Sequence, residues 1–270
     1  MRPSPAVVRP SPVSPRDYGD FVMDLAIRGR TAAVAAATAG LGFASAKALV
    51  EAGVRVAICG RTSERVESAA AALGGDTVGI ECDVSTAAGA AMFVEMARER
   101  LGGVDILVAN GGGPKPGNFS SLQVDDYLPA LQQSLLSVVA MCEAAVPSMR
   151  ERKWGRVVAI TSVAVRQPIP HLILSNTARA GVTGFLKTLA REVAGDGVTV
   201  NSVQPGIHAT DRVTQLYGAQ PDAKQLGIPA GVVGDPADFG RVVAFFCGEP
   251  ARFVTGTHLP VDGGSYSGLL

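Results

Sequence analysis

Short apolar runs rich in valine and isoleucine alternate with longer stretches of helical spacing along most of this 270-residue chain. Glycine or polar residues bound each run, as they bound the buried strands of parallel sheets. The expected strands are residues 32–37, 54–59, 78–81, 104–109, 156–160, 198–203 and 258–261. The expected helices are residues 44–52, 64–73, 87–101, 127–152, 172–194 and 236–247. The alternation predicts an α/β fold in a single domain: a Rossmann-type, doubly wound parallel sheet of about seven strands, flanked by helices.

Residues 1–22 differ in composition from the rest of the chain. Prolines alternate there with serine, arginine and valine, a composition that builds neither a helix nor a strand ladder. The stretch has no apolar core like that of a secretory signal peptide. We therefore expect residues 1–22 to be a disordered extension and residues 23–270 to be the folded domain. Within that domain, the Gly- and Pro-rich segment 206–235 is expected to be a mobile lid over the carboxyl end of the sheet.

Charge and cysteine content exclude several classes of function. Basic and acidic residues number 24 each and aromatic residues make up only 5% of the chain, so neither nucleic acid nor a membrane surface is an expected partner. No uninterrupted apolar stretch is long enough to cross a bilayer. The cysteines are widely spaced and form no CxxC pair, which predicts no metal site and a reducing, cytoplasmic location: Cys59, Cys82, Cys142 and Cys247.

The first expected strand runs into a glycine-containing turn that is followed by a helix. This turn contains Thr38, Gly40, Leu41 and Gly42. Glycines let the backbone approach a pyrophosphate closely, and the start of the following helix offers free N–H groups and a positive dipole end. An ordinary tight strand–helix turn also uses glycine, but the place of this turn in the first βαβ unit favours a nucleotide.

Further motifs, in the same order and spacing, resemble the short-chain dehydrogenase/reductases from about residue 28 to residue 264. The first turn of that family reads Thr-Gly-x-x-x-Gly-x-Gly, and Ala35 and Ala36 stand here in place of the first Thr and Gly. The other matching motifs are Asp83-Val84 near the adenine, Asn110-Gly111-Gly112 after the fourth strand, Asn201 with Pro205-Gly206 beside the nicotinamide, and Val261-Asp262-Gly263-Gly264 at the last strand. The resemblance implies a nicotinamide cofactor and a small-molecule substrate.

The end of the second strand bears on the choice of cofactor. Enzymes that prefer NAD usually carry an acidic residue there for the ribose hydroxyls. This chain has Arg61 and Thr62 instead, and no carboxylate. Arg61 suits a 2′-phosphate and Thr62 adds a hydroxyl, so NADPH is favoured over NADH, although a solvated loop arginine is the simpler alternative. Ala39, a second basic position in the family, carries no charge, so the preference is expected to be modest.

The resemblance also implies a catalytic set of serine, tyrosine, lysine and asparagine, and this chain departs from it. The serine is Ser162. Ser175 stands thirteen residues later where the tyrosine is usual, and Arg179 stands four residues beyond it in place of the lysine. Ser134 occupies the position of the asparagine. We therefore predict Ser162, Ser175, Arg179 and Ser134 as the catalytic set, with Arg179 also holding the cofactor.

These replacements change the expected chemistry. Arginine stays protonated and a serine hydroxyl is a far weaker acid than a tyrosine phenol, so protonating an alkoxide becomes difficult. Reduction of a conjugated C=C leaves an enolate that hydrogen bonds can stabilise while water protonates carbon. The prediction is thus an NADPH-dependent oxidoreductase that reduces a carbonyl or a conjugated enoyl (thio)ester with altered proton delivery. The alternatives are a non-catalytic NADPH-binding sensor or scaffold, and a ketoreductase in which a water bridged by Ser175 replaces the phenol.

Three other residues are candidate proton donors. His208 follows the Pro-Gly turn closely and is also expected to lie beside the nicotinamide. Tyr217 lies in the expected lid, and His171 lies four residues before Ser175. A surface or loop position is the simpler interpretation of each. Finally, the apolar helices 127–152 and 172–194 resemble those that relatives pack between subunits, so a homo-oligomer, dimer or tetramer, is expected.

Overall fold

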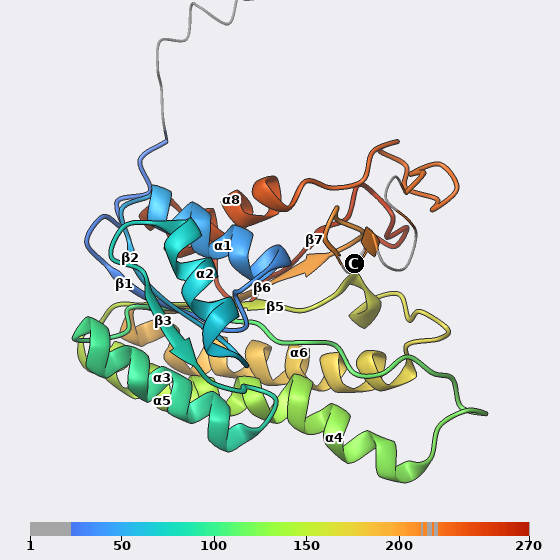
Figure 1. Ribbon diagram of the computed structural model, residues 1–270, viewed down its shortest axis with the longest axis horizontal. Coiled ribbons are helices and arrows are strands. Elements are labelled where there is room, and N and C mark those ends of the chain that lie inside the picture. Colours follow the sequence, from blue (N-terminus) through green and yellow to red (C-terminus); the bar gives the residue numbers. More distant parts are fainter. Residues whose placement is uncertain (1–22, 212, 215–217, 219–220, 270) are drawn as a thin grey trace, which may run out of the picture.

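Seven parallel strands form the centre of the structure, a computed structural model that describes residues 23–211, 213–214, 218 and 221–269 (Figure 1). The spatial order of the strands is β3-β2-β1-β4-β5-β6-β7, and every neighbouring pair is parallel. The strands are β1 (Thr31–Val34), β2 (Arg55–Gly60), β3 (Val78–Glu81), β4 (Ile106–Ala109), β5 (Gly155–Ile160), β6 (Val198–Pro205) and β7 (His258–Val261). The order reverses between β1 and β4, which opens a crevice at their carboxyl ends.

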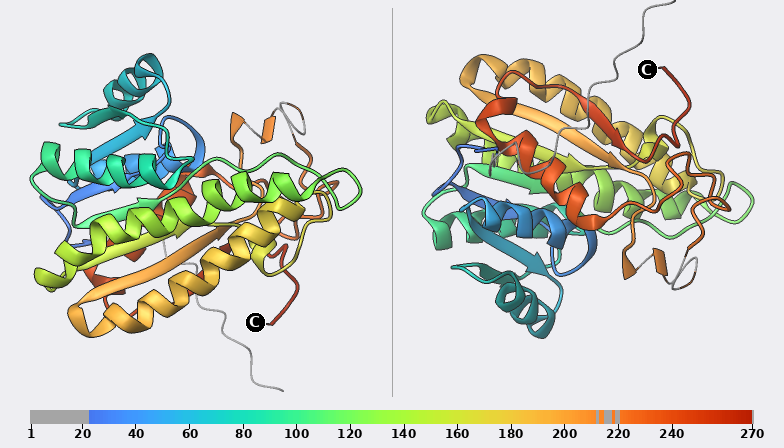
Figure 2. Two further views of the ribbon diagram at one scale, coloured as in Figure 1. Left: turned by 90° about the horizontal axis from the view of Figure 1, so that it is seen from below. Right: turned by 90° about the horizontal axis from the view of Figure 1, so that it is seen from above.

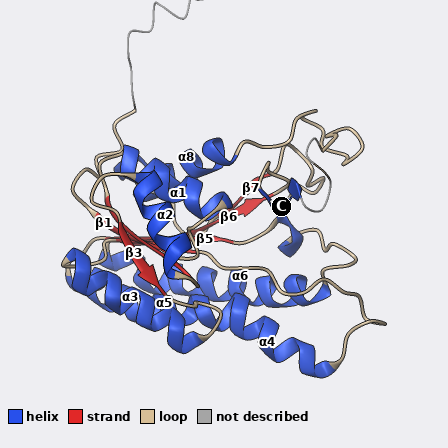
Figure 3. Ribbon diagram, in the orientation of Figure 1, coloured by secondary structure: helices blue, strands red, loops and turns tan. Residues whose placement is uncertain are grey.

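Helices cover both faces of this sheet (Figures 2 and 3). One layer consists of α1 (Gly40–Glu51), α2 (Ser63–Leu73) and α8 (Pro236–Cys247). The opposite layer consists of α3 (Ala87–Leu101), α5 (Ser137–Glu151) and α6 (Ile173–Val193). A continuous apolar cluster fills the space between each layer and the sheet, because the strands are buried on both faces. The predicted α/β fold with its doubly wound sheet is confirmed.

The first strand is shorter than the sequence pattern predicts. β1 ends at Val34, whereas the apolar run continues to residue 37. Ala36 adopts a left-handed backbone conformation with φ of 48°, which an extended strand does not allow. The N–H groups of Ala35 and Ala37 still donate to the neighbouring strands, at Val108 O and Cys59 O, so the turn at Ala36 interrupts the regular strand without separating the chain from the sheet. α1, in turn, begins at Gly40 rather than at residue 44, because its first turn contains glycines that composition does not assign to a helix.

The long helix expected at residues 127–152 has three parts. α4 (Tyr127–Leu131) leads into a π-helical segment, Gln132–Leu136, and then into α5. The stretch Val124–Glu151 has the length and mean hydropathy (1.2) of a membrane span. However, α5 packs against α3, and its apolar side chains, such as Met141, Ala145 and Met149, lie in the core beneath the sheet. Its apolar composition thus serves the core of the domain.

The segment after β6 is anchored at its base. His208 and Gly234 form an isolated bridge, and the N–H of Ala209 donates to the carbonyl of Gly234 (2.8 Å). Further along, the N–H of Ala230 donates to the carbonyl of Gly263 (2.9 Å) just beyond β7. These contacts hold the two ends of the segment 206–235 beside the carboxyl end of the sheet, where a lid was predicted. The disorder predicted for residues 1–22 lies outside the described residues.

Candidate active site

The turn between β1 and α1 presents an open helix start at the carboxyl edge of the sheet. Ala39 is the N-cap of α1, no side chain caps this terminus, and the first turn carries no acidic residue. Gly40 has a positive φ of 59°, and Leu41 is half-buried against the core. An uncapped helix start exposes N–H donors and a positive dipole end. The open start of α1 is compatible with a pyrophosphate, and the binding roles of Thr38, Gly40, Leu41 and Gly42 stay a prediction.

Gly42 and Asn110 tie this turn to the neighbouring one. The Asn110 amide donates from Nδ2 to the carbonyls of Ala35 and Ala36 (3.1 Å each). A Cβ on Gly42 would lie 2.6 Å from Asn110 Nδ2 and 2.8 Å from Ala36 O, so only glycine fits there. Asn110 directly follows β4, and the carbonyls belong to the β1 turn, so this contact spans the point where the strand order reverses. Asn110 therefore shapes the crevice with its side chain.

The ends of β2 and β3 offer polar groups to the same edge. Arg61 is exposed, and within the described part of the chain it makes no hydrogen bond or ion pair. Thr62 is the exposed N-cap of α2 and makes no side-chain capping bond. Asp83 is also exposed and accepts a hydrogen bond from the N–H of Ser85 (2.9 Å), whereas Val84 is buried. Arg61 and Thr62 thus form a cationic, donor-bearing end of β2 that suits a phosphate.

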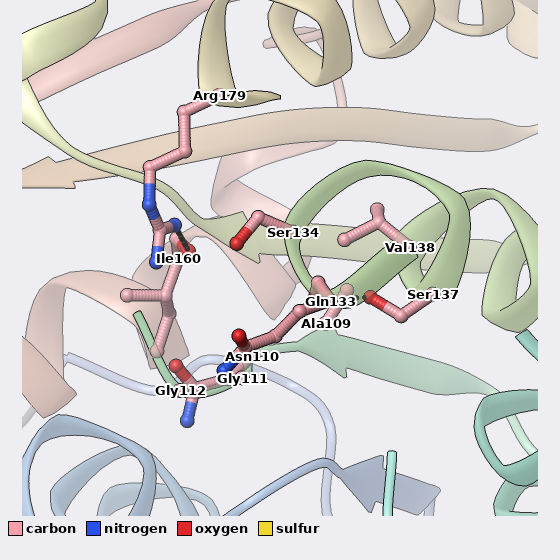
Figure 4. A pocket seen from close by; sticks show the side chains of 10 residues that line it. All are labelled: Ala109, Asn110, Gly111, Gly112, Gln133, Ser134, Ser137, Val138, Ile160 and Arg179. Atoms are coloured by element: carbon pink, nitrogen blue, oxygen red, sulfur yellow. Dashed lines mark hydrogen bonds between the residues drawn. The ribbon is translucent and has the colours of Figure 1, made fainter. Parts of the chain in front are cut away.

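Arg179 and Ser134 line the same small hollow between α6, the π-helical segment and the β4 turn (Figure 4). The turn contributes Asn110, Gly111 and Gly112 to the lining. The Arg179 guanidinium donates from NH1 to the carbonyl of Ile160 (3.1 Å), the last residue of β5. Ser134 is 5% exposed, and its Oγ has no hydrogen-bond partner among the described residues. The structure therefore brings together two of the four side chains predicted as catalytic.

Ser162 and Ser175 lie outside the lining of this hollow. Ser162 follows β5 directly after Thr161, and its Oγ accepts a hydrogen bond from the N–H of Ala164 (3.1 Å), so it caps a short 3-10 turn. Ser175 is half-buried on α6, one helical turn before Arg179. Both residues remain at the carboxyl edge of β5 and the facing end of α6. Their direct contact with substrate stays a prediction.

The Pro-Gly turn after β6 is fixed by the last strand. The N–H of Gly206 donates to the carbonyl of Val261 (2.9 Å), and a Cβ on Gly206 would lie 2.7 Å from the Cα of Asp262. Pro205, half-buried, ends β6 in register with Val261. Glycine is required here because another backbone passes close by. Packing between two strands thus accounts for this family motif.

His208 is buried against α8. It is 4% exposed, its ring meets the edge of Phe239 of α8 (5.1 Å between centroids), and its Nδ1 lies 3.3 Å from Gly206 O. Burial lowers the pKa of His208, an effect larger than the opposing hydrogen bond to Gly206 and the charges of Asp235 and Asp262. A neutral, buried imidazole is a poor proton donor, so its interpretation as the replacement acid loses support. Of the other two candidates, His171 is exposed, and Tyr217 lies outside the described residues.

Thr210 lies beside the turn between β1 and α1, and the sequence pattern does not predict this position. Its Cγ2 would lie 3.6 Å from a Cβ on Gly40, which places the threonine against the start of α1. A half-buried, hydroxyl-bearing residue thus lies beside the turn between β1 and α1, although it comes from the segment that follows β6. Its place four residues after Gly206 was the one signal available in the sequence. Gln133, which also lines the hollow, has no such signal.

Comparisons with known proteins agree with this architecture. A family model described as Enoyl-(Acyl carrier protein) reductase matches residues 35–266, and the chain belongs to this family of short-chain dehydrogenase/reductases. The 3-oxoacyl-[acyl-carrier-protein] reductase FabG of Haemophilus influenzae is 33% identical over 240 residues, which are 89% of this chain and 99% of that protein. The family resemblance predicted from the sequence is confirmed.

Two solved structures extend this likeness. An NADPH-bound short-chain oxidoreductase from Pseudomonas aeruginosa PAO1, described as containing an atypical catalytic center, has a TM-score of 0.82 at 29% identity and covers 88% of this chain and 97% of its own. The L-sorbose reductase of Gluconobacter frateurii, complexed with NADPH and L-sorbose, has a TM-score of 0.84 at 27% identity and covers 92% and 100%. Their likeness confirms the fold of the whole domain.

Proposed function

We propose that this protein is an NADPH-dependent reductase whose site suits a conjugated enoyl (thio)ester at least as well as a ketone. The observation that carries the proposal is the Arg179 guanidinium, held on the Ile160 carbonyl beside Ser134 at the carboxyl edge. This group supplies a fixed positive charge and does not act as an acid at neutral pH. The site is therefore equipped to stabilise negative charge and poorly equipped to deliver a proton.

The described residues fit NADPH. Thr38, Gly40, Leu41 and Gly42 would hold the pyrophosphate at the start of α1. The exposed pair Arg61 and Thr62 would bind the 2′-phosphate, because a guanidinium matches phosphate geometry in a bidentate way. Asp83 and Val84 would lie beside the adenine, Asn110, Gly111 and Gly112 in the centre, and Pro205, Gly206 and His208 beside the nicotinamide. The two solved relatives named above carry NADPH.

The proposed chemistry divides hydride and proton transfer between different sources. NADPH supplies the hydride when it is bound. Ser162, Ser175 and Arg179 then stabilise the developing oxyanion by hydrogen bonds and charge, whether it is an alkoxide or an enolate. An enolate needs no immediate proton on oxygen, and water can protonate carbon afterwards. A ketone substrate, by contrast, gives an alkoxide whose oxygen must be protonated. The family uses a tyrosine for that step, and this chain has Ser175 at the position of the tyrosine.

Paired substrates test this proposal directly. NADPH oxidation is measured with β-ketoacyl and enoyl thioesters of equal chain length, with NADH alongside. We expect turnover with the enoyl member and slower turnover with the ketoacyl member. The double substitution Ser175→Tyr with Arg179→Lys should raise the ketoacyl rate. Turnover of ketoacyl thioesters alone would contradict the proposal, and tight NADPH binding without any turnover would favour the sensor or scaffold.

We also propose that the protein is a homo-oligomer, dimer or tetramer. Apolar side chains stand exposed along the outer face of the α4 region, notably Val124, Leu128 and Leu136. Such residues are typical of surfaces that pack against another subunit. Light scattering of the purified protein distinguishes monomer, dimer and tetramer. A monomer at working concentration would contradict this part of the proposal.

A further inference from the structure

We infer that Ser134 is a positioning residue: its small side chain leaves room for the Arg179 guanidinium, and the two residues act as one unit. Its role is to fix where the positive charge lies at the cofactor edge. The part of this inference that concerns NADPH rests on the proposed function. The packing of the two side chains does not, and it can be tested on the protein without cofactor.

Both side chains are directed into the same hollow from different elements (Figure 4). Ser134 comes from the π-helical segment, and Arg179 comes from α6. One side of the guanidinium is held by the carbonyl of Ile160 (3.1 Å). A guanidinium is planar and carries donors only, so this bond anchors one end of the group at Ile160, while Ser134 lines the same hollow. The size of the residue at position 134 therefore limits where the guanidinium can lie.

The hydroxyl of Ser134 behaves unlike its neighbour one turn later. Ser137 is also buried, and its Oγ donates to the carbonyl of Gln133 (2.7 Å), the usual bond of a helical serine to its own backbone. Ser134 Oγ, although buried, has no partner among the described residues. A buried hydroxyl without a partner is costly and calls for an explanation. Facing the guanidinium, which carries N–H donors only, the Ser134 oxygen offers a matching acceptor.

The charge in the lining of the hollow is of one sign only, and it is positive. Arg179 is the one charged residue among the ten described residues that line it. That lining contains no carboxylate, so any acceptor that it offers to the guanidinium is neutral. A side chain larger than serine at position 134 would intrude into this space. The guanidinium would then have to leave the Ile160 carbonyl.

The family resemblance also links positions 134 and 179, because both differ from the usual residues of the family. Where relatives of this type have asparagine and lysine, this chain has the smaller serine at 134 and the bulkier guanidinium head at 179. Asparagine is larger than serine and would occupy more of the hollow beside Arg179, whereas lysine lacks the planar head of arginine and would occupy less of it. The two replacements are thus complementary in volume. We therefore expect their effects to be coupled.

A double-mutant cycle tests this coupling with Ser134→Asn, Arg179→Lys and the combination. The first readout is the thermal unfolding midpoint of the cofactor-free protein, and the second is the dissociation constant for NADPH. We expect Ser134→Asn alone to lower the midpoint and to weaken NADPH binding about tenfold, but to change binding less than about threefold when Arg179→Lys is present. Ser148→Asn, at a half-buried serine elsewhere on α5, is the control and should show no difference between the two backgrounds.

Two further variants keep the inference open to refutation. Ser134→Thr adds one methyl group and serves if the asparagine variant does not fold; it should show the same dependence on residue 179 to a smaller extent. Ser134→Ala removes the hydroxyl but keeps the space, so it should weaken NADPH binding less than Ser134→Asn does. Equal losses in both backgrounds, or an alanine variant as impaired as the asparagine variant, would overturn the inference. If the unmodified protein binds no NADPH, the proposed function fails, and the unfolding measurements still decide the pairing.

Discussion

The two halves of the carboxyl edge are built in different ways. At the nucleotide half, glycines and main-chain carbonyls determine the geometry: Gly42, Gly60 and Gly206 each leave no space for a Cβ. At the catalytic half, side chains determine it: Ser134, Ser162 and Arg179 are directed from three separate elements. A side chain can be replaced while its backbone stays in place, whereas a glycine in close contact cannot. The difference explains how this chain keeps the turns of its family and yet departs in the catalytic set.

The largest expected effect comes from Gly42→Ala. The added methyl group would lie 2.6 Å from Asn110 Nδ2 and 2.8 Å from the Ala36 carbonyl, so the two turns must separate. We expect a loss of about 3 kcal/mol in the free energy of unfolding and a loss of NADPH binding. Denaturant unfolding measures the first and titration the second. The control is Gly184→Ala, where an added Cβ meets nothing within 4 Å and helix propensity predicts a gain of up to about 1 kcal/mol.

Ser162→Ala tests the catalytic half, where loss of chemistry without loss of fold is expected. Removing a donor that stabilises an oxyanion lowers turnover by about 10²- to 10³-fold. The free energy of unfolding should fall by only about 1 kcal/mol, because the cap on the N–H of Ala164 is lost. Steady-state rates and NADPH affinity are measured together, and the affinity should not change. A variant as active as the parent protein would remove Ser162 from the proposed site.

Arg61→Glu probes a side chain within the nucleotide half. Because Arg61 is exposed and makes no bond within the described part of the chain, stability should not change. A lost charge-assisted bond to phosphate should weaken NADPH relative to NADH about tenfold to hundredfold. Both dissociation constants are measured by titration. Arg65→Glu, one turn into α2 and also exposed, is the matched control and should leave the ratio as it is.

Ala36→Gly tests whether the backbone is strained at Ala36, where the family has glycine. Alanine at φ of 48° is strained, and glycine is not. We expect the free energy of unfolding to rise by about 0.5–1 kcal/mol, the relief of strain minus the greater freedom of glycine in the unfolded chain. Ala37→Gly, at a position without positive φ, should lower it instead. A loss of stability in both variants would show that the turn is not strained.

The smallest expected effect is a dependence of the free energy of unfolding on pH that comes from His208 and not from the catalytic side chains. Burial lowers the pKa of His208, so the folded state keeps the imidazole neutral where the unfolded chain, with an ordinary pKa near 6.5, takes up a proton. The stability is therefore complete above about pH 6.5 and falls as the pH decreases below it. Unfolding free energies at neutral and mildly acidic pH measure this loss, and His208→Leu should reduce it.

His258 provides the comparison for that measurement. Its pKa is also lowered, first by burial and then by the charges of Lys187 and Arg166. Its imidazole Nδ1 pairs with Ser202 Oγ (2.8 Å) at the start of β7. His258→Asn should remove its own share of the acid sensitivity and leave the share of His208. If His208→Leu keeps the full acid sensitivity of the parent protein, the imidazole is not the group responsible.

The sheet could be predicted from the sequence because buried parallel strands have a plain signature. Apolar runs such as 78–81 and 258–261 coincide with β3 and β7. The order and spacing of the turn motifs indicated the family. The early end of β1 could not be predicted, because the left-handed backbone at Ala36 depends on the turn and alanine gives no sign of it. The π-helical segment was hidden for a similar reason, since one extra residue per turn hardly alters an apolar pattern.

For the candidate site, the position of a residue relative to the family motifs predicted its location better than its chemical type did. The alignment of Ser134 and Arg179 with the family set predicted two residues that the structure brings into one hollow. The burial of His208 could not be foreseen, because it depends on Phe239 from α8, about thirty residues away along the chain. Thr210 was missed because its neighbour, Gly40, lies at the other end of the sequence. Contacts between distant segments are the part that a local pattern does not contain.

The π-helical segment Gln132–Leu136 has a consequence for how this region can change. A π turn holds one residue more than the α-helical repeat allows, so the side chains before it are rotated about the axis relative to those of α5. Deleting a single residue from this segment would restore a regular helix and swing Ser134 away from its present direction. An insertion or deletion here therefore rotates the preceding side chains about the helix axis. Most such changes would move Ser134 out of reach of α6 while the helix itself stays intact.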